Sequence, residues 1–292
     1  MAAAAITAAI DDSHKLKTRF TFRSPTNDNI LEILLGNKDL NQLTKKGVKF
    51  NHNSVGITCP TVCSSGLSQH GMFPFCSGYP INEESKLIAF LDRFRRSSSS
   101  TSDNVTCSSI SYQGWRILRF RTRVGSGKRC YKRVQNAIYN WDFVAHDGKK
   151  SMGILAPKIP VHVARVEQAQ HTTFPRRGLL GSFSEVPLFK SLYVVNPIHS
   201  IADIKDQNNK KSKSMVSSSS YATLDGHLLS GEERVSVILT ENNAVHIEIV
   251  SFSRPAPSIN GRIVWPFIGR MQKQFFLEEI KHLSRIANNC LI

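Results

Sequence analysis

The sequence predicts an α+β protein in which an antiparallel sheet wraps around a long carboxy-terminal helix. Three stretches carry this prediction: a strand, tight turn and helix over residues 115–141, three hairpin-linked strands over residues 221–252, and an amphipathic helix over residues 266–289. A helix of that length must bury its apolar stripe, and the strands that precede it offer an apolar face to cover it.

In the first stretch, apolar and basic residues alternate from Trp115 to Val124. This two-residue period is typical of a strand with one buried and one solvated face, so the arginines at 119, 121 and 123 are expected to form an exposed ridge. After the turn at Gly125–Gly127, apolar residues recur at three- and four-residue steps as far as Trp141. They predict an amphipathic helix with Ser126 as its cap.

The carboxy-terminal third predicts a meander of three antiparallel strands, Tyr221–Leu229, Glu233–Thr240 and Ala244–Phe252. Residues that favour tight turns separate them, at Ser230–Gly231 and at Glu241–Asn243. Pro255 and Pro257 then end the sheet, because proline cannot donate to a strand ladder. Pro266 is expected to begin the last helix.

Weaker patterns organise the rest of the chain. They predict a short helix around Ile30–Leu43, strands at Val161–Val166 and Leu192–Val195, and a loop at His171–Pro187 between those strands. The serine runs Ser97–Ser100 and Ser217–Ser220 are interpreted as solvated insertions. We expect a loosely ordered extension over residues 1–44 and one domain over residues 45–290, with insertions near residues 59–109, 171–187 and 207–220.

The chain has 292 residues, 40% of them hydrophobic, and a formal charge of +16. This composition excludes a wholly disordered chain, and no stretch is apolar enough for a membrane helix. Residues 115–190 hold fifteen basic against four acidic residues and so carry +11 of the charge. An anionic membrane surface is one expected partner of this segment, and an acidic partner and a plain solvated face both stay open. The contact residues would be Arg119, Arg121, Arg123, Lys128, Arg129, Lys132 and Arg133. Nucleic acid is disfavoured, because no aromatic residues are interleaved with the exposed arginines.

The six cysteines favour a reducing, intracellular compartment, because no secretory signal of the usual shape precedes them. The alanine-rich start and the basic residues after it have some transit-peptide character, against which Asp11 and Asp12 count; cytoplasm and chloroplast both stay open. The residues His52, Cys59, Cys63, His70 and Cys76 lack the paired spacing of a zinc site. We expect no metal and no cofactor. The oligomeric state stays open.

Four motifs resemble a known family. They are Val124–Gly127, Gly226–Leu229 with Gly231–Glu233, Ser251–Ala256, and Trp265–Pro266 before an aromatic-rich helix. In order and spacing they resemble a plant member of the family called domain of unknown function nineteen-ninety, and Phe50–Gly56 resembles its amino-terminal segment. The resemblance implies a helix-grip fold related to the START and birch-pollen-allergen superfamily, with a curved sheet over an apolar cavity. It also implies an alternative, a channel of the chloroplast outer envelope.

The leading hypothesis is a domain that binds an apolar or lipid-like molecule without catalysis. Its candidate ligand-binding residues are Tyr221, Gly226, His227, Glu232, Arg254, Trp265, Met271 and Phe275. An alternative is an enzyme that uses His227, Glu232 and Arg254 in acid–base chemistry, since a neighbouring carboxylate shifts the titration of histidine. A third interpretation is structural, with Gly231 and Glu232 in a hairpin turn and Arg254 in a salt bridge. The Gly125–Lys128 turn lacks the spacing of a phosphate-binding loop, and we interpret it as a cap.

Overall fold

The computed structural model describes residues 16–51, 105–112, 115–142, 152–164, 177–186, 191–209, 214–257 and 259–288. Helices and strands follow one another in the order β1 (Arg19–Thr21), α1 (Ile30–Leu35), α2 (Leu40–Lys46), β2 (Thr106–Tyr112), β3 (Trp115–Ser126), α4 (Gly127–Asn140), β4 (Met152–Leu155), β5 (Leu179–Glu185), β6 (Tyr193–Asn209), β7 (Ser214–Thr223), β8 (Leu229–Leu239), β9 (Ala244–Pro255) and α5 (Ile259–Asn288).

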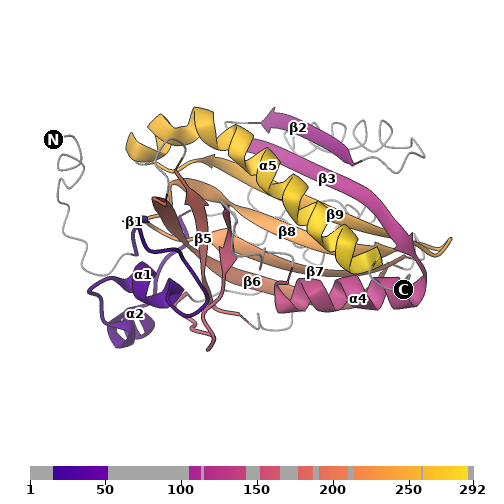
Figure 1. Cartoon of the computed structure of the whole chain (residues 1–292), viewed down its shortest axis with the longest axis horizontal. Helices are drawn as coiled ribbons and strands as arrows, with labels where there is room; N and C mark the ends of the chain where they lie inside the picture. The colour runs from indigo at the N-terminus through magenta and orange to yellow at the C-terminus, as the bar shows by residue number, and fades with distance from the viewer. Residues whose placement is uncertain are drawn as a thin grey trace, which may run out of the picture.

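The nine strands form one antiparallel sheet in the order β2-β3-β9-β8-β7-β6-β5-β4, with β1 paired to β6. Figure 1 shows the sheet curled around α5, which lies diagonally across one face, while α4 lies beside β7 and β8 on the same side. We call the face that carries α4 and α5 the inner face. The structure confirms the α+β class and the helix-grip arrangement.

The main core lies between the inner face and the two long helices. Alternate residues of β3, β8 and β9 point into it, because successive side chains of a strand face opposite sides. Phe120 meets Phe276 of α5 edge to face, with ring centroids 5.6 Å apart. Ile280 and Leu283 continue the buried stripe of α5 at helical spacing. Each such side chain contributes about 1.5–3 kcal/mol when it is buried.

A second core lies on the outer face of β5 and β6. Part of the segment that was expected to be a loosely ordered extension belongs to this core. Leu16, Ile30 and Leu34 are fully buried there, so residues 16–44 pack against the domain. The single helix expected at Ile30–Leu43 is two helices. Gly36, at φ 57°, ends α1, and the Asp39 side chain caps α2 by accepting from the Asn41 amide.

Three further expectations for the middle of the chain are wrong. Residues 161–164 form no strand, and the expected loop at 171–187 contains β5. The serines 217–220 are buried in β7, and residues 207–209 and 214–216 belong to the paired strands β6 and β7. Serine can occupy these positions because its hydroxyl finds partners inside the protein: Ser219 donates to Asp203 Oδ1 at 2.6 Å.

In the carboxy-terminal third the meander is confirmed, but one turn and one helix start differ. The chain reverses at Gly226, whose φ is 90°, while Gly231 lies within β8. The turn before Ala244 is confirmed, with Asn243 at φ 61°. The last helix begins at Ile259, and Pro266 lies inside it as an exposed residue. A proline there removes one amide donor and does not end the helix.

The helix expected after the Gly125–Gly127 turn is confirmed as α4, with Ser126 at its N-cap position, although the Ser126 side chain makes no capping hydrogen bond. Some expectations lie outside the described residues: the run Ser97–Ser100, the insertion at 59–104, the cysteines at 59, 63 and 76, and most of Phe50–Gly56.

Candidate functional site

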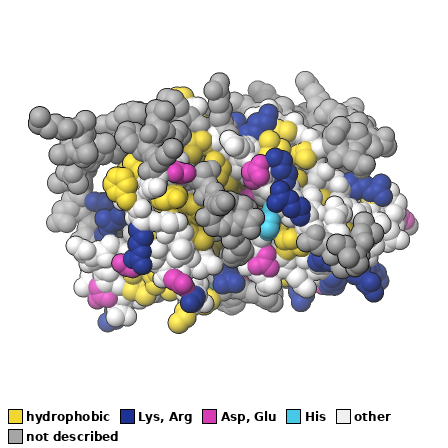
Figure 2. Space-filling model, in the orientation of Figure 1, with side chains coloured by type: hydrophobic (Ala, Val, Ile, Leu, Met, Phe, Trp, Pro, Cys, Tyr) yellow, Lys and Arg dark blue, Asp and Glu magenta, His cyan; other side chains and the backbone are white. Residues whose placement is uncertain are grey.

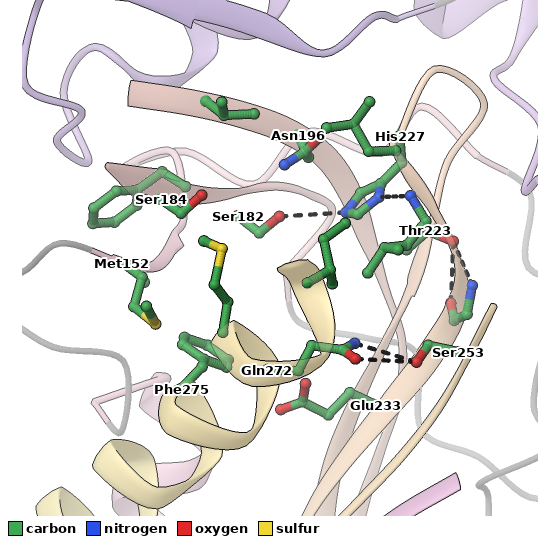
Figure 3. A pocket seen from close by; sticks show the side chains of 18 of the residues that line it. Met152, Ser182, Ser184, Asn196, Thr223, His227, Glu233, Ser253, Gln272 and Phe275 are labelled. Carbon is green, nitrogen blue, oxygen red and sulfur yellow. Dashed lines mark hydrogen bonds between the residues drawn. The ribbon is translucent and has the colours of Figure 1, made fainter. Parts of the chain in front are cut away.

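A cavity of about 460 Å³ lies between α5 and the inner face of the sheet. Its wall is mostly apolar and is built by β4 to β9 together with the first half of α5. Figure 3 shows Met152, Ser182 and Phe275 among the side chains around it. This volume falls within the range of small-molecule sites.

The cavity forms where inward-facing side chains change from large to small. Along β9, Ile247 and Ile249 fill the core, whereas Ser251 and Ser253 at the next two inward positions line the cavity. Gly231 of β8 makes the same change beside Ser253. The opposite wall comes from the α5 stripe, mainly Met271 and Phe275. Helix and sheet therefore leave a space that their side chains do not fill.

His227 is the polar residue whose hydrogen bonds are best defined. Its Nδ1 accepts from the Leu229 backbone amide at 2.8 Å, and its Nε2 lies 3.4 Å from Ser182 Oγ (Figure 3). Because a backbone amide can only donate, Nδ1 carries no proton and Nε2 carries one. Burial lowers the pKa of His227 to about 3, so the imidazole is neutral. Neither nitrogen is poised to accept a proton from a substrate.

Glu233 and Tyr221 form a buried polar pair in the same wall. Tyr221 donates its hydroxyl hydrogen to Glu233 Oε2 at 2.5 Å. Burial raises the pKa of Glu233 to about 8, and hydrogen bonds from Tyr221 and Glu279 oppose that rise. Glu233 is therefore mostly protonated at neutral pH. A neutral carboxyl group can stay beside apolar side chains that would exclude a carboxylate.

Of the candidate ligand-binding residues, Tyr221, His227, Met271 and Phe275 line the cavity, and Glu232 borders it from β8 with its side chain on the opposite face of the sheet. Gly226, Arg254 and Trp265 do not. Gly226 instead makes the close turn against Leu16, and Arg254 stacks on the Trp115 ring with its guanidinium carbon 4.3 Å from the centroid.

The structure does not bring the proposed acid–base trio together. Glu232 is paired with Phe252, one position out of phase with Glu233, so its side chain lies on the outer face of the sheet. Arg254 lies on that face too, whereas His227 faces the cavity. The turn expected at Gly231 and Glu232 is likewise absent, because both belong to β8.

Several cavity residues were not among the candidates. They are mostly small or polar: Ser182, Ser184, Asn196, Thr223, Ser253 and Gln272. The alternation of β5, from Leu180 to Ser182 and Ser184, carries the signal that would have found two of them, but this strand was interpreted as a loop.

The predicted basic ridge is divided between two environments. Arg119 is buried and donates to Glu248 Oε2 from Nε at 2.9 Å and from Nη2 at 2.5 Å. Arg121 is half-buried near the same carboxylate, and Arg123 is exposed. The three arginines therefore do not form one exposed ridge: Glu248 holds Arg119 inside the protein, and only Arg123 is fully on the surface.

A second cavity of about 720 Å³ lies where the end of β3 meets the carboxy-terminal half of α5. Arg123, Lys281 and Arg285 line it, and all three are exposed. Lys128 and Arg129 at the start of α4 are also exposed. Figure 2 shows Lys and Arg side chains gathered at the end of the molecule where α4 and α5 meet. We call these five residues the basic end.

The described residues were compared with two further kinds of site, a metal centre and a membrane-spanning helix. The described residues contain no cluster of three or more metal-ligating side chains. Among the described helices, none is long and apolar enough to cross a membrane.

The chain belongs to the family described as Domain of unknown function (DUF1990), whose model matches residues 101–281. It is 27% identical over 168 residues to UPF0548 protein At2g17695 of Arabidopsis thaliana, a match that covers 58% of this chain and 71% of that protein.

Solved structures give weaker likenesses. TTHA0849 from Thermus thermophilus has a TM-score of 0.37 at 9% identity, covering 60% of this chain and 99% of that one. Human STARD10 has a TM-score of 0.31 at 7% identity, covering 71% and 81%. Norcoclaurine synthase from Thalictrum flavum has a TM-score of 0.32 at 12% identity, covering 63% and 98%. Such scores support no transfer of a ligand or an activity.

Proposed function

We propose that the protein binds an apolar or lipid-like molecule in the cavity between α5 and the sheet. The observation that carries this proposal is the volume of about 460 Å³ behind a mostly apolar wall. The apolar atoms that line this cavity have no neighbouring atoms on the side that faces it. A ligand that fills the cavity would supply the missing van der Waals contacts.

Catalysis is not part of this proposal. The Nδ1 atom of His227 is held by a backbone amide, and the side chains of Glu232 and Arg254 lie across the sheet from the imidazole. General acid–base chemistry needs its groups within hydrogen-bond reach of one reacting atom. The trio does not meet that condition.

The test is uptake of the neutral apolar dye Nile red, together with solvent extraction and mass spectrometry of the purified full chain. Met271→Trp enlarges a side chain in the cavity wall, and we expect it to reduce dye uptake about tenfold. Gln274→Trp places the same side chain on the exposed face of α5 and serves as the control. Equal dye uptake by both variants, with no co-purifying apolar molecule, would reject the proposal.

A second proposal concerns docking: we infer that the basic end meets an anionic membrane surface. Arg123, Lys128 and Arg129 are exposed, and none of them is engaged by Glu248 in the way that Arg119 is. Cations near an anionic leaflet each contribute about 1 kcal/mol, and salt screens this attraction.

Co-sedimentation with phosphatidylserine-containing vesicles tests the docking. We expect the double variant Lys128→Ser, Arg129→Ser to bind less than the wild type at low salt. The control Lys45→Ser, Lys49→Ser removes the same charge from exposed positions on and just after α2, at the far end of the molecule (Figure 1). Equal loss in both variants would reject a role for the basic end. So would equal binding to vesicles of phosphatidylcholine alone.

A further inference from the structure

We propose that the cavity selects neutral apolar molecules that carry a hydrogen-bond-accepting oxygen, such as a ketone or an ester, and rejects the carboxylates of fatty acids. This inference rests on the proposed function and names the ligand class for the same site. Two independent features carry it, the hydrogen-bond polarity of one wall and the absence of a cation among the described residues that line the cavity.

The first feature is a pair of hydrogen-bond donors on β5 and the β7–β8 turn. The Leu229 amide occupies His227 Nδ1, which leaves the proton on Nε2, and Nε2 points toward Ser182 Oγ at 3.4 Å (Figure 3). That separation is longer than an ordinary N–H···O bond, so the Nε2 hydrogen is weakly held. Ser182 accepts in this contact, and its own hydroxyl hydrogen has no acceptor among the described residues. The wall therefore offers two donors.

A ligand oxygen can satisfy both donors at once, because carbonyl and ester oxygens have two lone pairs. An alkane would leave the donors as they are, and a buried donor without a partner is unfavourable. The cavity should therefore prefer an oxygen-bearing molecule over a hydrocarbon of the same length. A ligand amine, which brings further donors to this wall, finds no acceptor on Nδ1.

The second feature is the absence of a cation among the described residues that line the cavity. None of these residues is lysine or arginine; the carboxyl groups that face the cavity are those of Glu185 and Glu233, and Glu233 is mostly protonated, while Glu232 has its side chain on the outer face of the sheet. A carboxylate that enters loses its hydration and gains no ion pair. Two neutral donors do not replace that hydration. The same wall that favours a neutral oxygen thus disfavours an ionised one.

The experiment compares four ligands with the same hydrocarbon chain: the alkane, the methyl ketone, the methyl ester and the free acid, which is ionised near pH 7. Displacement of Nile red from the full chain gives their relative affinities. We expect the ketone and ester to bind about tenfold more tightly than the alkane and the carboxylate. A carboxylate that binds as tightly as its ester would overturn the inference and leave the proposed function intact. Failure of all four ligands would overturn the proposed function itself, and the selectivity with it.

A pair of variants tests the donors. Ser182→Ala removes one donor, and we expect it to weaken ketone binding about fivefold while alkane binding changes little. Ser126→Ala is the control, since Ser126 is exposed at the start of α4, lies outside this cavity and makes no capping hydrogen bond with its side chain. An unchanged ketone-to-alkane ratio in Ser182→Ala would overturn the donor role. So would an equal fall of that ratio in both variants.

Discussion

Replacing Glu248 by glutamine should destabilise the protein strongly, because this carboxylate neutralises arginines in the interior. Glu248 accepts hydrogen bonds from Arg119 and, at 3.1 Å, from Arg234, and all three residues are buried. Burial by itself would raise the pKa of Glu248, but the charges of Arg119, Arg234 and Arg121 outweigh burial and lower it to about 2. The ionised form is therefore the stabilised one.

The size of the effect follows from that pKa. A fall from 4.5 to about 2 corresponds to about 3 kcal/mol, at about 1.4 kcal/mol per unit. Removing one partner of a buried ion pair costs about 3–5 kcal/mol, because the other charge is left uncompensated. Both arguments give the same range, and that is a large part of the roughly 5–15 kcal/mol that stabilises an ordinary domain.

Urea unfolding followed by circular dichroism measures the loss near pH 7. Glu278→Gln is the control, because Glu278 pairs with Lys281 on the exposed surface of α5, where such pairs contribute about 0.3–0.5 kcal/mol. Since the pKa of Glu248 is lowered in the folded state, its stabilisation is complete above about pH 4.5 and is lost as the pH falls toward 2. The difference between wild type and Glu248→Gln should narrow on acidification. A Glu248→Gln variant within about 1 kcal/mol of the wild type would refute the reasoning.

Three other changes have defined outcomes. Gly226→Ala should lower the free energy of unfolding in urea by more than about 2 kcal/mol, because φ is 90° and the new Cβ would lie 1.8 Å from the Leu16 carbonyl oxygen. Gly127→Ala is the control: φ is 80° but the space around it is open, so the loss should be about 1 kcal/mol. Burial raises the pKa of Glu233 from 4.5 to about 8 in the folded state, so the stability of the wild type should fall as the pH rises between those values. In Glu233→Gln, the urea concentration at the unfolding midpoint should depend less on pH over that range. Because the folded pKa of His227 is lowered from 6.5 to about 3, stability should fall as the pH drops through that window, and His227→Gln should reduce the slope measured in the same way.

The sequence was informative where one periodicity dominates. The alternation of β3 and β9 and the helical stripe of α5 predicted an antiparallel sheet around the last helix, because in each element one face is buried throughout. The prediction was wrong for β7, because its run of serines was interpreted as a solvated insertion and is buried in the sheet. A serine hydroxyl that is hydrogen-bonded inside the protein, as Ser219 is to Asp203, does not need water as a partner and can therefore be buried. Local composition does not reveal such long-range partners.

The candidate site was only half predictable for a related reason. Met271 and Phe275 were predicted because helical spacing places them on one apolar stripe. Ser251 and Ser253 were not, because they contribute to the cavity by having side chains too small to fill it. A cavity arises when small residues on several strands coincide in space beneath a helix, and that coincidence depends on register. Register also decides the charge pattern: the pairing of Arg121 with Glu248 brings Arg119 into the interior, while Arg123, paired with His246, stays exposed. The same strand thus supplies a structural arginine and a surface one, and only the exposed end of it can meet a partner.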